Sequence, residues 1–188
     1  MLGVVQPGCG RKGRMEYIFE TERLRIRTFR TDDAARLYEI HADEAVKKWI
    51  PNETYKDTEE AREAAGFFAG RAARKALPYV LAVELKETGE LIGDTGINEV
   101  EGKPGEVEIG FVICRECRGK GYAAELVKAM TAYAVSAFQI TSLYGRVMKG
   151  NAASESVLKK NGYRFIAEES GAEDDPYGNG MLIYRKKS

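Results

Sequence analysis

The sequence predicts an α/β (α+β) protein whose central sheet is mixed, mostly antiparallel and flanked by helices. Apolar residues alternate with period two, as in a strand with one buried face, over 107–113, and the segments 79–85 and 91–97 are predicted to be the two strands of a hairpin. Apolar residues recur at helical spacing over 34–41 and 123–138. Thr88 and Gly89 join the two hairpin segments, which favours antiparallel pairing.

The amino-terminal half begins with an alternating segment, 17–29, which predicts one strand. The residues 31–33, Thr-Asp-Asp, are typical of a helix start and precede the helical pattern of 34–41. Pro51 breaks the chain before a second helix, which we expect to be capped near Asp57 or Thr58.

The carboxy-terminal half continues with predicted strands and helices in the order strand 106–113, helix 123–138, strand 143–148, a short helix ended by Gly162, and strands around 163–168 and 181–185. No internal repeat is found, and 188 residues suit one domain with its own core. We therefore expect a single domain over 15–188. Residues 1–14, with four glycines, one proline and no apolar periodicity, are predicted to be a disordered arm.

Composition narrows the function classes. Lys plus Arg equals Asp plus Glu at 29 each, so no global charge favours nucleic acid or an anionic membrane. No apolar run reaches the length of a membrane span, and the start of the chain is too short for a secretory signal. The three cysteines, Cys9, Cys114 and Cys117, cannot form a closed disulfide set. These features predict a cytoplasmic protein without nucleic-acid or membrane partners.

The run from Arg118 to Ala123 is the most informative segment, because it lies between a predicted strand and a predicted helix. Gly119 and Gly121 allow a tight turn whose N–H groups point into one concavity, and the helix adds the positive end of its dipole. Arg118 and Lys120 place two cations beside it. The segment is therefore predicted to bind a diphosphate, although many glycine turns of this kind bind nothing.

Two other phosphate motifs compare less well with this loop. No G-x-x-x-x-G-K-[ST] pattern runs through it, which excludes a P-loop. The spacing Gly119-x-Gly121-x-x-Ala124 does fit a dinucleotide fingerprint, which expects an acidic residue about 20 positions on, after the next strand. That strand ends in Lys149 and Gly150 instead. A dinucleotide-dependent oxidoreductase therefore ranks third among the functions considered.

Arg118, Gly121 and Ala123 fit the pattern R-x-x-G-x-A, which resembles the acyl-CoA diphosphate loop of the GNAT superfamily of N-acetyltransferases. The segment 151–163, N-x-x-S followed by V-L-K-K-N-G-Y, is similar to the branch that contains the RimJ and RimL ribosomal-protein acetyltransferases. The opening E-T-E-R-L-R-I-R, from Glu20, is also similar to that branch. Together the three matches span the chain from about Glu20 to its end.

The resemblance implies the GNAT acyl-CoA N-acyltransferase fold, with acetyl-CoA as co-substrate and no metal. It implies that Asn151 orients the CoA arm. The residues implied to contact acetyl-CoA are Val112, Ile113, Arg118, Gly119, Lys120, Gly121, Tyr122, Ala123 and Asn151.

Glu108 is the candidate general base. Period-two alternation puts it on the face of its strand opposite the apolar row, where glutamates are commonly only solvated. It matches, however, the strand glutamate that serves as base in several GNAT enzymes, and partial burial would raise its pKa toward the range a base needs. Gly110 is expected to mark a strand bulge that opens backbone groups toward the pantetheine arm.

Ser154 is the candidate acid for the leaving thiolate. Many GNAT relatives carry a tyrosine acid seven residues after the motif asparagine, and here that position is Leu158. In the branch that the sequence resembles, the serine of N-x-x-S is the substitute. The structural alternative for Ser154 is a helix N-cap, and for Asn151 a turn residue.

Other residues carry weaker signals. Cys114 and Cys117 have metal-ligand spacing but too few further ligands to hold zinc, so no metal site is expected. His41 is interpreted as structural or exposed, and Trp49 is expected near the mouth of the acceptor site. The acidic run 168–175 is interpreted as a solvated loop or as an attraction for a cationic acceptor.

The sequence thus predicts transfer of acetyl from acetyl-CoA to a primary amine by direct attack in a ternary complex. The amine is a protein N-terminus or a small molecule, and the enzyme is a monomer or a homodimer. The main alternative is a non-catalytic acyl-CoA-binding module of the same fold, which would bind the thioester without turnover.

Overall fold

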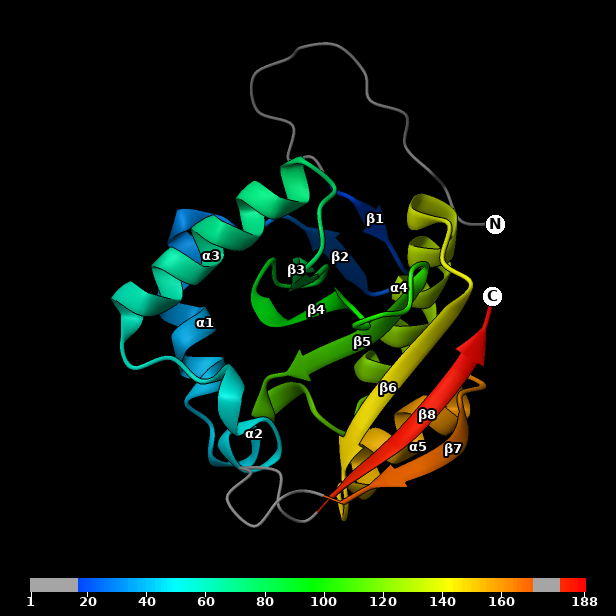
Figure 1. Ribbon diagram of the computed structural model, residues 1–188. Helices are drawn as coiled ribbons and strands as arrows, with labels where there is room; N and C mark the ends of the chain where they lie inside the picture. The colour runs from blue at the N-terminus through cyan, green and yellow to red at the C-terminus, as the bar shows by residue number, and fades with distance from the viewer. Residues whose placement is uncertain (1–16, 171–179) are drawn as a thin grey trace.

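The computed structural model describes residues 17–170 and 180–188, which form one eight-stranded sheet with helices on both faces (Figure 1). The strand order is β1-β2-β3-β4-β5-β6-β8-β7, and only β5 and β6 are parallel. The strands are β1 (Phe19–Glu20), β2 (Leu24–Arg27), β3 (Tyr79–Leu85), β4 (Leu91–Glu99), β5 (Glu106–Ile113), β6 (Ser142–Met148), β7 (Arg164–Glu169) and β8 (Met181–Lys187). The mixed, mostly antiparallel sheet predicted from the sequence is confirmed.

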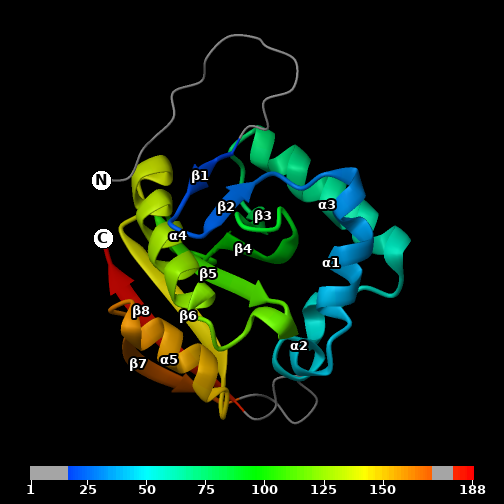
Figure 2. The same cartoon turned by 180° about the vertical axis from the view of Figure 1, so that it is seen from behind.

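The helices are α1 (Ala34–His41), α2 (Glu44–Trp49), α3 (Thr58–Ala73), α4 (Tyr122–Phe138) and α5 (Ala152–Lys160), with 3₁₀ turns η1 (Thr31–Asp33), η2 (Pro51–Glu53) and η3 (Arg115–Cys117). Tyr79 of β3 contacts the rings of Tyr133 and Phe138 in α4, so its face of the sheet lies under α4. Asp94 of β4 bonds to His41, so the other face lies under α1, which packs on α3. Figures 1 and 2 show α4 behind and in front of the sheet, respectively.

Most predicted elements are present with ends shifted by a few residues, one expectation was wrong, and one helix was not predicted. The segment 17–29 forms two antiparallel strands instead of one, because the chain reverses between Thr21 and Leu24. The Thr21 hydroxyl oxygen accepts the N–H of Leu24 at 2.9 Å, and this side chain closes the turn. The short helix α2 was not predicted. It begins where the Asp43 carboxylate accepts the N–H of Ala45 at 3.1 Å.

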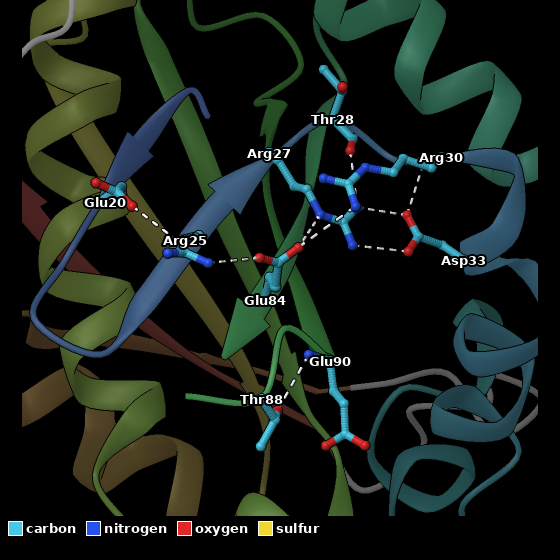
Figure 3. Close-up of polar contacts among 9 residues, drawn as sticks. All are labelled: Glu20, Arg25, Arg27, Thr28, Arg30, Asp33, Glu84, Thr88 and Glu90. Atoms are coloured by element: carbon cyan, nitrogen blue, oxygen red, sulfur yellow. Dashed lines mark hydrogen bonds and ion pairs between the residues drawn. The ribbon is translucent and has the colours of Figure 1, made fainter. Parts of the chain in front are cut away.

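A buried charge network joins β2, η1 and β3 (Figure 3). The Arg27 guanidinium donates two bonds to Asp33, at 2.7 and 2.9 Å, and one to Glu84 at 2.8 Å. Arg27 is 3% exposed and Glu84 is 1% exposed. A buried ion that loses its partner is strongly destabilising. The network therefore fixes the position of η1, and of α1 after it, relative to β2 and β3.

Some predicted features fall outside the described residues: the arm 1–14, Cys9, and the part of the acidic run beyond residue 170. Among the helices that the structure describes, each is too short or too polar to cross a bilayer.

Candidate active site

The site begins where the only parallel strand pair of residues 17–170 and 180–188 separates. β5 and β6 are paired from Glu106 with Ser142 to Glu108 with Tyr144. Beyond that point β5 stays with β4 as far as Ile113, while β6 stays with β8 as far as Met148. After Glu108, the edge of β5 that faces β6 therefore has no strand partner among the described residues. The backbone N–H and C=O groups on that edge border an opening in the sheet.

A groove of about 420 Å³ lies in this opening, a volume in the range of small-molecule sites. Its walls come from the end of β5, the loop before α4, the start of α5, and α2. The lining residues are Ala45, Val46, Trp49, Ile50, Phe111, Val112, Ile113, Cys117, Arg118, Gly119, Gly121, Tyr122, Ala123, Ala124, Asn151, Ala153, Ser154, Ser156, Val157 and Lys160. Nine of the predicted site residues thus meet in one place. Glu108 and Lys120 do not line the groove.

The glycine loop has the conformation that an anion cradle needs. Gly119 and Gly121 have φ of +76° and +85°, in the left-handed region that favours glycine, and Gly121 is the N-cap of α4. A Cβ on Gly119 would meet nothing within 4 Å, so open space borders the loop there. The first N–H groups of a 17-residue helix point toward the same end of the groove.

Arg23, which sequence reasoning did not select, supports this loop from the turn between β1 and β2. Its guanidinium donates to the carbonyl oxygen of Lys120 at 2.9 Å and to the Glu125 carboxylate in α4 at 2.7 Å. It also stacks on the Tyr122 ring, 4.4 Å from the centroid. The sequence offered only the E-T-E-R-L match as a signal, because the contact joins positions about one hundred residues apart.

The two predicted phosphate cations differ in the structure. Arg118 donates to the carbonyl oxygen of Ile113 at 3.0 Å and to the Asp43 carboxylate at 2.8 Å, so it connects β5 and α2 to the loop. This pairing helps to hold the pKa of Asp43 below its usual value, although burial works in the opposite direction. Lys120 is exposed, and the described hydrogen bonds use its carbonyl and leave its ammonium to solvent.

The start of α5 forms the opposite wall. Asn151 is its N-cap, and its side-chain oxygen accepts the N–H of Ser154 at 3.2 Å. The structural alternative considered for Ser154, a helix cap, is therefore wrong, because Asn151 has that place. No hydrogen bond to the Ser154 hydroxyl is found within residues 17–170 and 180–188, and this half-buried side chain faces the groove.

Leu158 does not reach the site. It is 1% exposed and packs on Gly145 of β6, where a Cβ would come within 2.6 Å of it. Two tyrosines near this wall have other partners: the hydroxyls of Tyr163 and Tyr184 pair with Thr131 and Glu155, both at 2.7 Å. Two hydroxyl residues of α5, Ser154 and Ser156, line the groove, and Ser154 is the one that the sequence motif selects.

Glu108 lies at the point where β5 and β6 separate and is half-buried. Burial raises its pKa, the Arg146 guanidinium lowers it, and the Glu169 carboxylate raises it again, with a net shift upward. The bulge expected at Gly110 was wrong, because the register of β4 and β5 runs without a shift from 93 with 113 to 99 with 107. The separation of β5 from β6 makes the opening instead.

The remaining predicted positions are structural in part. Cys114 and Cys117 are buried free thiols, and burial, with hydrogen bonds to Cys117 and Glu116, raises the pKa of Cys114 to about 12. No cluster of metal-binding side chains is found in the described ranges. Trp49 lines the groove from α2, and His41 is buried instead of exposed.

Comparisons with known proteins agree with this geometry. A model of the acetyltransferase (GNAT) domain matches residues 23–164. The uncharacterized N-acetyltransferase p20 of Bacillus licheniformis is 28% identical over 174 residues, which cover 90% of this chain and 92% of that protein.

Solved structures share the fold. A GNAT-family acetyltransferase from Bacillus anthracis superposes with a TM-score of 0.76 at 25% identity, covering 89% of this chain and 96% of that one. RimL, the ribosomal L7/L12 alpha-N-protein acetyltransferase, in complex with coenzyme A, superposes with a TM-score of 0.74 at 18% identity, covering 92% and 98%. The family match, the relative and the geometry of the groove together establish that this chain is a member of the GNAT acetyltransferase family.

Proposed function

We propose that this protein transfers the acetyl group of acetyl-CoA to a primary amine, a protein N-terminus or a small molecule, by direct attack in a ternary complex. The observation that carries the proposal is the separation of β5 and β6 at Glu108, beside a glycine loop at the N-terminus of α4. The edge of β5 offers backbone groups to the extended pantetheine arm of acetyl-CoA, and the glycine loop offers N–H groups to its diphosphate.

The chain's residues divide the binding task by position. Gly119 and Gly121, with the first N–H groups of α4, hold the diphosphate, and Lys120 adds an exposed positive charge. The free edge of β5 at Val112 and Ile113 receives the pantetheine amides. Asn151 caps α5 and thereby shapes the wall that carries Ser154. Bound acetyl-CoA supplies an activated acyl group as a thioester.

The chemical step needs a proton acceptor and a proton donor. Glu108 accepts the proton that the amine loses as its nitrogen attacks the thioester carbonyl, directly or through one water. The raised pKa of Glu108 suits a base that works near neutral pH. As the carbon–sulfur bond breaks, Ser154 gives its hydroxyl proton to the departing thiolate and regains one from solvent.

A coenzyme A release assay across peptide N-termini, polyamines and aminoglycosides tests the proposal. We expect turnover above the hydrolytic background for at least one of these classes. Tight acetyl-CoA binding without turnover on any amine would instead identify a non-catalytic acyl-CoA-binding module. The observation that favours this alternative is that position 158 is a leucine and not a tyrosine.

A further inference from the structure

His41 connects α1, β4 and η2, next to strand β5, which carries Glu108. It is the last residue of α1 and is 2% exposed. Its Nε2 lies 2.7 Å from the Asp94 carboxylate on β4, and its Nδ1 contacts the main-chain carbonyl oxygen of Glu53 in η2. One ring therefore connects the helix, the sheet and the 3₁₀ turn.

Both partners of this ring are acceptors. A carbonyl oxygen has no proton to give, and neither has an ionised carboxylate, so both contacts are hydrogen bonds only if both ring nitrogens donate. That state is the imidazolium. Burial alone would lower the pKa of His41, but the charge and hydrogen bond of Asp94 and the Glu53 carbonyl outweigh it and raise the pKa. The carboxy-terminal end of α1 also favours a cation.

The sheet face beside His41 is open. Directly paired residues of antiparallel strands share a face, and the register pairs Asp94 with Val112, Gly96 with Gly110 and Asn98 with Glu108. Asp94 and Glu108 therefore lie on one face with Gly110 between them. Gly110 is exposed, and a Cβ placed there would meet no atom within 4 Å. This leaves room for a small group over Gly110.

Two carboxylates border this opening. The Glu53 side chain is solvent-exposed, yet its pKa is raised by desolvation and by the charges of Asp94 and Glu108, while His41 lowers it in part. The main-chain carbonyl oxygen of Glu53 contacts His41, whose other ring nitrogen bonds to Asp94 on the sheet face that also carries Glu108, so Glu53 lies beside the same face as Glu108. Neither carboxylate has an ion pair or hydrogen bond in the described part of the chain. Arg146, the nearby cation, is bonded to Glu169 at 2.7 Å.

We propose that Glu53 determines specificity for a cationic amine, and that His41 is the positioning residue that holds Glu53 over Gly110. The acceptor is recognised as an ammonium ion between Glu53 and Glu108. It loses one proton to solvent before the attack, and Glu108 accepts the second proton as the carbon–nitrogen bond forms. The inference rests on the proposed function and adds to it a residue from η2, which the resemblance to the family did not select.

The first experiment reads the protonation of His41 directly. It is the only histidine of the chain, so the imidazole signals of untagged protein in ¹⁵N NMR are unambiguous. We expect the titration midpoint to lie above the ordinary value of 6.5, and both ring nitrogens to carry protons below that midpoint. A midpoint at or below 6.5 overturns the positioning role of His41. The groups facing the ring are Asp94, Glu53 and Tyr55.

The second experiment is a kinetic double-mutant cycle with the best amine of the release assay. Glu53→Gln keeps the carbonyl bonded to His41 and removes only the charge, so KM for the amine should rise about 10-fold while the acetyl-CoA KM changes less than about twofold. The control Glu63→Gln removes an exposed carboxylate from α3 and should change neither constant.

The variant His41→Gln distinguishes a role of His41 in positioning Glu53 from a role in stabilising the fold as a whole. If His41 acts through Glu53, His41→Gln raises the amine KM in the parent and raises it no further in Glu53→Gln. Independent, additive effects overturn the positioning role, and an unchanged amine KM in Glu53→Gln overturns the specificity role. If the parent turns over no amine, the proposed function fails, and the NMR result still decides the state of His41.

Discussion

At the scale of single residues, the proposed chemistry depends on two side chains whose surroundings differ. Glu108 is half-buried where two strands separate, with its pKa raised by burial. Ser154 is held at the start of α5 by the cap that Asn151 provides, with its hydroxyl facing the groove. The role of each residue can be tested by a substitution that removes its ability to accept or donate a proton and leaves the backbone unchanged.

Glu108→Gln keeps the shape of the side chain and removes its ability to accept a proton. We expect kcat/KM to fall by about 10²-fold near neutral pH, with acetyl-CoA affinity unchanged. Because the pKa of Glu108 is raised, the parent's kcat/KM should increase as pH rises through that pKa, and the variant should lose this limb. A pH series of initial rates checks both points. Glu99→Gln, an exposed glutamate of β4, is the control.

If Glu108→Gln turns over like the parent at every pH, Glu108 takes no part in proton transfer. The amine proton would then leave through water alone, and the raised pKa of Glu108 would reflect only its partial burial.

Ser154→Ala should slow the chemical step by about 10²-fold if the hydroxyl protonates the thiolate. Because Asn151 is the cap of α5, the variant should keep the parent's melting temperature. Single-turnover kinetics and thermal melting together check this prediction. Ser136→Ala, which removes an exposed hydroxyl from α4, controls for the loss of a helix serine. Parent-like turnover in Ser154→Ala would mean that the thiolate leaves without this donor.

At the scale of elements, the groove proposed to bind acetyl-CoA is made by the end of β5, the loop before α4, the starts of α4 and α5, and α2. The loop adopts left-handed backbone at Gly119 and Gly121, and Arg23 supports it from a turn near the amino terminus. Its shape therefore depends on positions distant in sequence, and a change in the loop should affect binding before it affects the core.

Gly121→Val places a branched side chain at φ +85°, where strain costs about 1–3 kcal/mol. Its Cβ would also lie 3.4 Å from the Arg23 guanidinium. We expect acetyl-CoA affinity to fall by at least about 10-fold in a protein that still folds, because the core lies elsewhere. Calorimetry measures the affinity, and circular dichroism verifies folding. Gly66→Val in α3, where a Cβ meets nothing within 4 Å, is the matched control. Unchanged affinity would remove the diphosphate assignment.

At the scale of the whole molecule, one buried histidine is expected to link stability to pH. His41 connects α1, η2 and β4, and its pKa is raised in the folded state. A raised folded-state pKa stabilises the fold fully below the unfolded value of 6.5, and this contribution is lost as pH rises through the folded-state pKa.

We therefore expect the melting temperature of the parent, relative to that of His41→Gln, to decrease as pH rises from about 6.5 upward. The comparison is specific because the chain has one histidine. Scanning calorimetry of both proteins from pH 6 to pH 9 measures it. A constant difference between the two melting curves would show that His41 binds its proton no more tightly in the folded state than in the unfolded one.

The local sequence determined the sheet, its helices and the glycine loop, because period-two and helical spacing and paired glycines are properties of neighbouring residues. It also identified Glu108 and Ser154 as candidates through the GNAT resemblance. Its errors, a single strand over 17–29 and a bulge at Gly110, concern turn chemistry and register, which depend on hydrogen bonds to particular partners.

Only the tertiary structure decided which side chains meet. The support of Arg23 for the loop joins residues 97 apart, and the His41–Asp94 bond joins residues 53 apart. No local pattern encodes such contacts, because they arise when packing of the core brings distant elements together. For the same reason the contacts of His41 with Asp94 and with the carbonyl oxygen of Glu53 could be read only from the folded chain.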